Sequence, residues 1–405
     1  MPERRIAIAG CGPCGLAAAL LLHRAGFAVE MFERFETPQP VGSGLMIQPT
    51  GLAVLAQLGM SERLIAQGQR IDRLYGVAGG QTVLDVRYAN LPRKGQFGVG
   101  VHRASLFDVL YEAVQAEGVP ISTGRAVTGS RPTPEGRVLR FAGGDESAPF
   151  DLVVDALGAR SSLAPPVGRD LAYGALWASL DWGRETGLDP HTLSQRYRRA
   201  SVMAGVLPTG KGRGETARAA FFWSLRADQW ADWKARGLEP WKAEVAALWP
   251  ECVAYLDQIH SPEQLTFARY AHRTLPKPSE RGLIHLGDAW HSASPQLGQG
   301  ANMALLDAWA LAQGLKASAD MDQAISAAAA SRRLHVRLYQ ALTWIFTPVY
   351  QSDSRVLPVL RDRLVGPLSK LWPATALQAA MVSGLIGDPL PGLDLTAYAG
   401  PDRPT

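Results

Sequence analysis

The sequence lacks the features that mark several protein classes. It has only three cysteines in 405 residues, too few for a disulfide framework, so we expect a reducing, cytoplasmic location. No run of about 18 apolar residues occurs, and the apolar stretch before Cys11 spans only residues 6–9, short of the roughly 7–15 residues of a secretory signal. The 41 basic and 37 acidic residues are mixed, which does not favour nucleic-acid binding. No residue spacing typical of a metal site occurs either.

Near the amino terminus, the stretch AIAGCGPCGLAAA contains two overlapping motifs. Cys11 and Cys14 form a C-x-x-C, as in dithiol–disulfide enzymes. Gly10, Gly12 and Gly15 form the G-x-G-x-x-G of a dinucleotide-binding turn. The two motifs predict different chemistry, so the surrounding sequence has to decide between them.

The context favours a nucleotide. RRIAIAG is typical of a buried strand, PCGLAAALLLHRAG of a helix and FAVEMFER of a second strand, which together predict one βαβ unit. Gly10 permits the tight turn, Gly12 lets the backbone approach a pyrophosphate, and Gly15 allows close helix packing. Glu33 ends the second strand, where a carboxylate accepts hydrogen bonds from ribose hydroxyls. A redox pair explains neither the glycine spacing nor Glu33, although oxidation of Cys11 and Cys14 in the nucleotide-free protein stays open.

A second motif, GLIHLGDAWHSASPQLGQGANMALLDAWAL, covers residues 282–311. It predicts a strand that ends near Asp288, a loop rich in glycine, and a helix that begins around Gly300. Asp288 can bind a polyol, while Gly298 and Gly300 let the backbone approach a flat ligand. The helix start near Ala301 and Asn302 can stabilise an anion. An ordinary capped helix needs fewer glycine and polar residues than this loop holds.

The remaining segments predict an interrupted α/β organisation. Strand patterns alternate with helix patterns in residues 1–70, 100–170 and 276–330, which we assign to a nucleotide-binding domain. Strand-rich residues 71–99 and 171–275 predict an interleaved second domain of mixed β-sheet, with helices near 228–260. Three strand candidates within residues 119–156 favour a β-meander joined to the parallel sheet. Residues 331–405 are expected to form a C-terminal helical segment with an irregular end.

Three weaker signals have ordinary explanations. AGVLPTGKG (204–212) matches part of a phosphate loop, but Gly212 follows the lysine where Ser or Thr is needed, so a hairpin is expected. His291 has no nucleophile motif or second metal ligand beside it and is expected to be structural or to line a pocket. The apolar segment 341–384 is expected to cover the core. Its alternatives are a dimer contact, which leaves a monomer or homodimer open, and a peripheral membrane contact.

Together these motifs resemble the FAD-dependent aromatic hydroxylases of the p-hydroxybenzoate hydroxylase type, the class A flavin monooxygenases. The resemblance rests on the glycine turn with Glu33 and on four further stretches. These are GSGLMIQPTGLAVLAQLG, VHRASLFDVL, DLVVDALGARSSL and GDAWHSASPQLGQGANMALLDA, in that order over residues 5–315. It implies a Rossmann-like FAD domain of the glutathione reductase type with an interleaved substrate domain, FAD as cofactor, and NADH or NADPH as a transient reductant.

The resemblance also implies roles for individual residues. Glu33 would hold the adenosine ribose, Arg103 the FAD linker and Asp288 the ribityl or pyrophosphate region. Backbone at 300–302 would face the flavin, and Pro295 would line the site above the ring. The complete set of expected cofactor-binding residues is Gly10, Gly12, Cys14, Gly15, Glu33, Arg34, Gly44, Arg103, Asp288, Gly298, Gly300, Ala301 and Asn302. Met46, Tyr270 and Pro295 are pocket candidates, and no catalytic base is assigned.

One departure bears on the reaction. The family's middle motif carries an aspartate where this chain has Leu157, which leaves the docking of the reductant open. The implied reaction inserts one oxygen atom of O₂ into a small aromatic or heteroaromatic substrate through a C4a-hydroperoxyflavin. The alternatives are a flavin oxidoreductase or epoxidase, and a non-catalytic flavin protein that binds a reactive intermediate.

Overall fold

The computed structural model describes residues 4–40, 42–366 and 370–398, and its first sheet is largely parallel. β1 lies between two parallel neighbours, and an antiparallel strand, β17, closes one edge. Ile6 and Ile8 of β1 point to one side of the sheet and Ala7 and Ala9 to the other, as strand periodicity requires. In spatial order the strands are β17 (Ser279–Glu280), β18 (Leu283–His285), β11 (Leu152–Asp155), β1 (Arg5–Ala9), β2 (Ala28–Phe32) and β8 (Ile121–Ser122).

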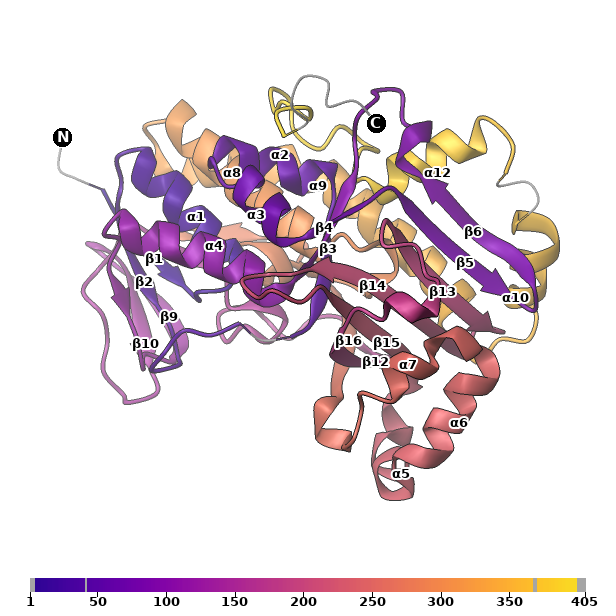
Figure 1. Ribbon diagram of the computed structural model, residues 1–405. Helices are drawn as coiled ribbons and strands as arrows, with labels where there is room; N and C mark the ends of the chain where they lie inside the picture. The colour runs from indigo at the N-terminus through magenta and orange to yellow at the C-terminus, as the bar shows by residue number, and fades with distance from the viewer. Residues whose placement is uncertain (1–3, 41, 367–369, 399–405) are drawn as a thin grey trace.

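Helices cover one face of this sheet and a hairpin covers the other (Figure 1). α1 packs between two other helices, and the five helices share one apolar core with Ile6 and Ile8. They are α1 (Pro13–Arg24), α2 (Pro49–Gln57), α3 (Ser61–Gln67), α4 (Arg103–Ala116) and α8 (Gly300–Ala317). On the opposite face, β9 (Val127–Thr133) and β10 (Gly136–Phe141) form a separate two-stranded sheet.

A second, eight-stranded sheet carries the middle of the chain. The helices α5, α6 and α7 lie beside it (Figure 1), and their aromatic side chains Trp233, Trp241 and Tyr255 join the apolar cluster on one face of the sheet. Its strands, in order, are β19 (His291–Ser292), β16 (Thr266–Thr274), β12 (Arg169–Asp181), β15 (Arg218–Arg226), β14 (Val202–Gly210), β13 (Thr192–Arg198), β5 (Arg73–Ala78) and β6 (Gln81–Arg87). The covering helices are α5 (Trp230–Arg236), α6 (Leu238–Leu248) and α7 (Val253–Leu256).

A small sheet joins the two halves. It consists of β3 (Gly44–Ile47), β7 (Gly98–His102) and β4 (Gln69–Ile71). At Gly100 a Cβ would lie 2.0 Å from the Pro208 carbonyl oxygen of β14, and at Gly44 it would lie 2.3 Å from Ala220 Cβ of β15. The absence of side chains at these two positions therefore lets the small sheet press directly against the eight-stranded sheet.

The C-terminal helices begin with the long α9 (Met321–Tyr350), which packs along α8. α10 (Leu357–Leu360), a π-helical turn (Arg361–Val365) and α12 (Ala374–Val382) follow. Within the described part of the chain, no helix is long and apolar enough to cross a membrane.

The sequence predictions for the βαβ unit and for the hairpin at residues 204–218 are confirmed. The prediction of a three-stranded meander within 119–156 is wrong. β8 and β11 join the parallel sheet beside β2 and β1, and only β9 and β10 form a hairpin. The strand patterns gave no information about pairing partners. β8 and β11 lie at the two ends of this segment and pair with strands outside it.

Candidate functional site

The glycine turn is closed on one side and open on the other. Gly10 has φ +105°, and a Cβ there would lie 2.7 Å from the Ala156 carbonyl oxygen. A Cβ on Gly15 would lie 2.0 Å from the Gly10 oxygen, so helix α1 packs tightly on the turn. At Gly12 a Cβ would meet nothing within 4 Å. Packing thus explains Gly10 and Gly15, while Gly12 faces free space at the N-terminus of α1, where amide hydrogens have no helical partners.

Glu33 is buried at the end of β2 and bonded to this turn. Its Oε2 accepts a hydrogen bond from Cys11 N at 3.0 Å, and its Oε1 accepts one from Phe35 N at 3.1 Å. Each carboxylate oxygen keeps further acceptor capacity for a hydroxyl donor. The neighbouring Arg34 is exposed and its guanidinium lies 4.6 Å from the centre of the Phe35 ring.

The second motif brings another open helix start to the same region. No side chain caps the N-terminus of α8. Gly300 is exposed, and a Cβ added there would lie 3.9 Å from Asp288 Oδ1. α1 packs against α8, and the Cys14 thiol donates to the Ala304 carbonyl at 3.6 Å. The two glycine-rich loops, nearly 290 residues apart in the sequence, are therefore neighbours.

Asp288, Arg103 and Tyr270 lie in one region, because the Arg103 charge acts on both of the other two side chains. Burial raises the pKa of the Asp288 carboxyl, opposed by the charges of His291 and Arg103. Burial also raises the pKa of Tyr270 to about 12, against the Trp177 hydrogen bond and the Arg103 charge. Yet Asp288 is exposed by surface area and Tyr270 is only partly buried. Protein therefore surrounds both side chains while leaving them in contact with solvent.

Asn302 fixes the loop that leads into α8. Its side chain is fully buried and forms three hydrogen bonds. Oδ1 accepts from Gln48 N at 2.8 Å, and Nδ2 donates to the carbonyl oxygens of Met46 at 3.2 Å and Gly298 at 2.9 Å. The side chain thus locks β3 to the start of α8, and only its backbone N–H remains for a ligand.

Two glutamines in this region were missed by the sequence reasoning. Gln48 is 1% exposed, and its Oε1 accepts from Tyr88 OH at 2.5 Å. Gln299 Nε2 donates to the Val382 carbonyl at 2.5 Å, which ties the loop to the C-terminal chain. Their signal was their position inside the two motifs, but nothing in the sequence identified Tyr88 or Val382 as the partners.

The other predicted residues divide by environment. Met46 is buried in an apolar cluster with Tyr88, and Gly44 packs on β15. Pro295 is exposed and starts a short turn that leads to Gly298, which has φ +61°. Ala301, in the first turn of α8, is partly buried.

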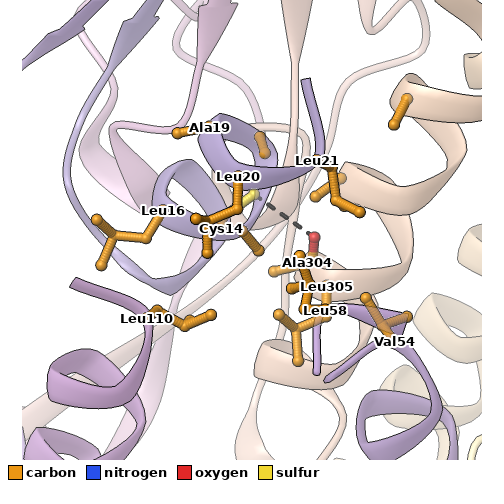
Figure 2. Packing of buried hydrophobic residues seen from close by; sticks show 14 of the residues in the cluster. Cys14, Leu16, Ala19, Leu20, Leu21, Val54, Leu58, Leu110, Ala304 and Leu305 are labelled. Atoms are coloured by element: carbon orange, nitrogen blue, oxygen red, sulfur yellow. Dashed lines mark hydrogen bonds between the residues drawn. The ribbon is translucent and has the colours of Figure 1, made fainter. Parts of the chain in front are cut away.

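Cys11 and Cys14 are free, buried thiols. Burial and the charge of Glu33 raise the pKa of Cys11 to about 12, and burial raises the pKa of Cys14 as well. Figure 2 shows Cys14 among the apolar side chains between α1 and α8. A raised pKa disfavours the reactive thiolate, so this geometry gives the C-x-x-C no support as a redox centre.

Two buried polar groups hold the surrounding loops. Asp155 is fully buried, accepts from Ser161 Oγ at 2.6 Å and pairs with His285 Nδ1 at 2.6 Å. It also accepts from the backbone N–H of Leu157 at 3.0 Å, while the Leu157 side chain packs against the apolar cluster on the hairpin side of the sheet.

The second group centres on Asp307 of α8. Its carboxylate accepts from Arg332 Nε at 2.9 Å and from Gly287 N at 2.9 Å, and lies 2.6 Å from His291 Nε2. Burial alone would raise the pKa of Asp307, but His291 and Arg332 hold it below its ordinary value. His291 is therefore structural, as the sequence predicted, and it secures the segment that carries Asp288.

These features fit a flavin dinucleotide. The open space at Gly12 and two uncapped helix starts suit phosphate and flavin oxygens, and Glu33 and Asp288 offer carboxylates for hydroxyl groups. Within residues 4–40, 42–366 and 370–398, no group of three or more His, Cys, Asp or Glu side chains could hold a metal ion.

Comparison with known proteins agrees with this chemistry. Residues 3–338 match the family described as "FAD binding domain". The chain is 30% identical over 319 residues to 3-amino-4-hydroxybenzoate 2-monooxygenase of Streptomyces cremeus, covering 75% of this chain and 76% of that protein. It is 27% identical over 383 residues to aurachin C monooxygenase/isomerase of Stigmatella aurantiaca, covering 90% and 94%.

Solved structures show the same fold. The tetrameric form of 2-methyl-3-hydroxypyridine-5-carboxylic acid oxygenase superposes with a TM-score of 0.78 at 21% identity, covering 95% of this chain and 98% of that one. Klebsiella pneumoniae HpxO, complexed with FAD and uric acid, gives 0.77 at 18% identity, covering 94% and 97%. With the family match over most of its length, the chain belongs to the FAD binding domain family and is an FAD-dependent aromatic hydroxylase of the p-hydroxybenzoate hydroxylase type.

Proposed function

We propose that one FAD molecule extends from Glu33 to the start of α8. Glu33 and Arg34 would hold the adenosine end, and the Gly10–Gly15 turn, with its two cysteines as bystanders, would hold the pyrophosphate. Arg103 and Asp288 would bind the linker, and the loop from Gly298 to Asn302 would face the flavin ring. The observation that carries this assignment is the open space at Gly12, since its neighbours Gly10 and Gly15 are tightly packed.

The proposed domains follow the two large sheets. The segments 1–70, 100–170 and 276–330 would form a Rossmann-like FAD domain of the glutathione reductase type. Segments 71–99 and 171–275 would form the substrate domain, with 331–405 as a C-terminal helical segment. The strand order of the parallel sheet, with β1 at its centre, supports this division. We predict that the protein is cytoplasmic.

The reaction that we propose is NAD(P)H-dependent insertion of one oxygen atom into an aromatic or heteroaromatic ring. When bound, FAD supplies the two-electron chemistry that activates O₂. The chain contributes the unpaired N–H groups of α8, which stabilise negative charge at the adjacent end of a bound ligand. Its apolar sheet side chains exclude water from the ring.

A neutral, flat substrate suits the residues that line the joint between the halves. One apolar cluster, around Met46, Leu207 and Ala220, lies there. A second, around Met203 and Phe222, lies on the eight-stranded sheet, and Trp177 packs against both. Trp177 Nε1 donates to Tyr270 OH at 3.0 Å. Within the described residues, the Tyr270 hydroxyl hydrogen has no acceptor and is available to a polar group of the substrate.

Purified protein should be yellow and should oxidise NADH or NADPH faster when a substrate is present. We would screen neutral phenols, quinolones and other heteroaromatics against their carboxylated analogues, and follow ¹⁸O₂ into the product. One labelled oxygen in the product supports the monooxygenase. Oxidation of NAD(P)H that no ligand stimulates would instead favour a flavin protein that binds without turnover. Asp288→Asn should lower FAD affinity, whereas Lys277→Gln, an exposed change on the loop before β17, should not.

A further inference from the structure

The exposed apolar side chains of this protein are concentrated in one part of the chain. Of the ten large hydrophobic residues that the structure describes as exposed, nine lie within residues 334–377 and only Val253 lies elsewhere. Trp372 is 83% exposed and Leu334 is 69% exposed. We call this set the C-terminal apolar surface: Leu334, Trp344, Ile345, Val356, Val359, Leu360, Leu371, Trp372 and Leu377.

Part of this surface is the outer side of α9. The helix already buries one side, with Val336, Tyr339 and Thr343 in contact with the protein interior. Leu334, Ala341 and Ile345 are exposed at spacings of seven and four residues, which places them on the opposite side. A helix whose second side also carries exposed leucine, isoleucine and tryptophan has more apolar surface than the fold covers.

The elements that carry the surface form one packed unit. α10 contacts α9, and Arg361 Nη1 donates to the Val349 carbonyl at 3.3 Å. α12 is joined to α9 through Tyr339 OH, which donates to the Met381 carbonyl at 2.9 Å. α10 and α12 lie beside β6, an edge strand of the eight-stranded sheet, whereas α9 runs along α8 (Figure 1).

The charges around the surface are of one sign. Residues 331–378 contain only two acidic residues. Asp353 binds Tyr173 and Arg226, and Asp362 binds Arg361 at 2.7 Å. Five exposed cations have no carboxylate partner within residues 4–40, 42–366 and 370–398: Arg333, Arg337, Arg355, Arg363 and Lys370. The apolar side chains are thus accompanied by unneutralised positive charge.

We propose that the C-terminal apolar surface binds peripherally to an anionic membrane surface. Exposed tryptophan beside arginine and lysine is the composition of helices that lie in the lipid interface, with apolar groups inserted and cations against the phosphates. A second copy of the chain fits less well. A twofold contact places the same surface face to face, which would oppose the five cations with themselves. This inference goes beyond the proposed reaction and does not depend on it.

The test uses the FAD-loaded protein and sedimentation with vesicles. It should bind phosphatidylcholine vesicles that contain phosphatidylglycerol and bind pure phosphatidylcholine much less, and added salt should weaken binding. Each cation near an anionic surface contributes about a fivefold factor, so Arg333→Glu with Arg337→Glu should weaken binding by at least about 25-fold. The matched control is Lys277→Glu with Arg281→Glu, two exposed cations outside the surface with the same change in net charge.

A second pair of variants tests the apolar contribution. Trp344→Ser with Trp372→Ser should weaken vesicle binding about tenfold or more, while Val253→Ser should leave it unchanged. FAD absorbance and thermal unfolding check that each variant is folded. Equal binding to neutral and anionic vesicles, or no binding to either, would overturn the proposal. So would a dimer in light scattering that Trp372→Ser converts to monomer, since the surface would then join two copies.

Discussion

Replacing Gly12 with alanine should weaken FAD binding while leaving the fold intact. Gly12 has φ −73° and ψ 173°, a conformation that alanine adopts freely, and its Cβ would contact no protein atom within 4 Å. Alanine is a poorer N-cap than glycine but restricts the unfolded chain, so the two effects leave the free energy of unfolding within about 1 kcal/mol of wild type.

The added methyl would occupy the space that we assign to the pyrophosphate. Overpacking of one methyl costs about 1–3 kcal/mol, which corresponds to about 5–150-fold weaker FAD binding. The assay titrates FAD into apoprotein by flavin fluorescence quenching, with urea unfolding in parallel. Gly214→Ala is the matched control, because its Cβ lies 3.4 Å from the nearest atom in the turn between β14 and β15.

Gly15→Ala provides the contrast. A Cβ there would lie 2.0 Å from the Gly10 oxygen, so this variant should lose stability together with FAD. If Gly12→Ala kept both wild-type FAD affinity and wild-type stability, the pyrophosphate would not lie against Gly12, and the assignment of the site would be refuted.

Three further outcomes are expected. Asn302→Ala removes three buried hydrogen bonds and leaves Gln48 N and the Met46 carbonyl without this partner. Urea unfolding should show that the free energy of unfolding falls by about 2–4 kcal/mol. A decrease of less than about 1 kcal/mol would contradict the role given to this side chain. Burial and Arg332 lower the pKa of His335 from 6.5 to about 3, so the unfolded chain takes up this proton at higher pH than the folded protein. The free energy of unfolding should therefore decrease by about 2 kcal/mol between pH 7 and pH 5 because of His335. His335→Gln should remove that part of the pH dependence. Burial raises the pKa of all three cysteines, which disfavours the reactive thiolate. A thiol reagent should therefore react slowly with the folded protein, with or without FAD, and quickly after unfolding. Rapid reaction of two thiols in the native state would show that the C-x-x-C is accessible.

Local sequence predicted the parts of the site that lie within one motif. The spacing of Gly10, Gly12 and Gly15 between a strand and a helix predicted the turn, because positive φ and close packing leave few residue choices. The helix start at Gly300 was predicted from the change between a glycine-rich loop and a helix pattern, and α8 begins there. The sequence also predicts that Glu33 and Asp288 contact the cofactor, and FAD titration of Asp288→Asn tests the second of these contacts.

What the sequence could not predict are partners that are distant along the chain. The strands within 119–156 were predicted as strands but paired wrongly, since β11 pairs with β1 some 145 residues away. Backbone at 300–302 was predicted to face the cofactor, but nothing in the sequence indicated that the Asn302 side chain binds Gln48, Met46 and Gly298. The bonds of Arg332 and His335 to the carbonyls of Pro389 and Gly384 involve backbone groups, which every residue carries and no motif marks.

The stretch after α12 has a consequence for engineering this enzyme. Its backbone carbonyls at Pro389 and Gly384 accept hydrogen bonds from Arg332 and His335, and the Tyr398 ring packs edge-on against Phe97 with ring centres 5.4 Å apart. A chimera that exchanges the eight-stranded sheet with that of a relative should therefore retain the parental residues 379–398. A foreign tail that follows a different path would leave Arg332 Nη1 and His335 Nε2 in the interior without these carbonyl acceptors, and the hybrid would fail at assembly before its specificity could be measured.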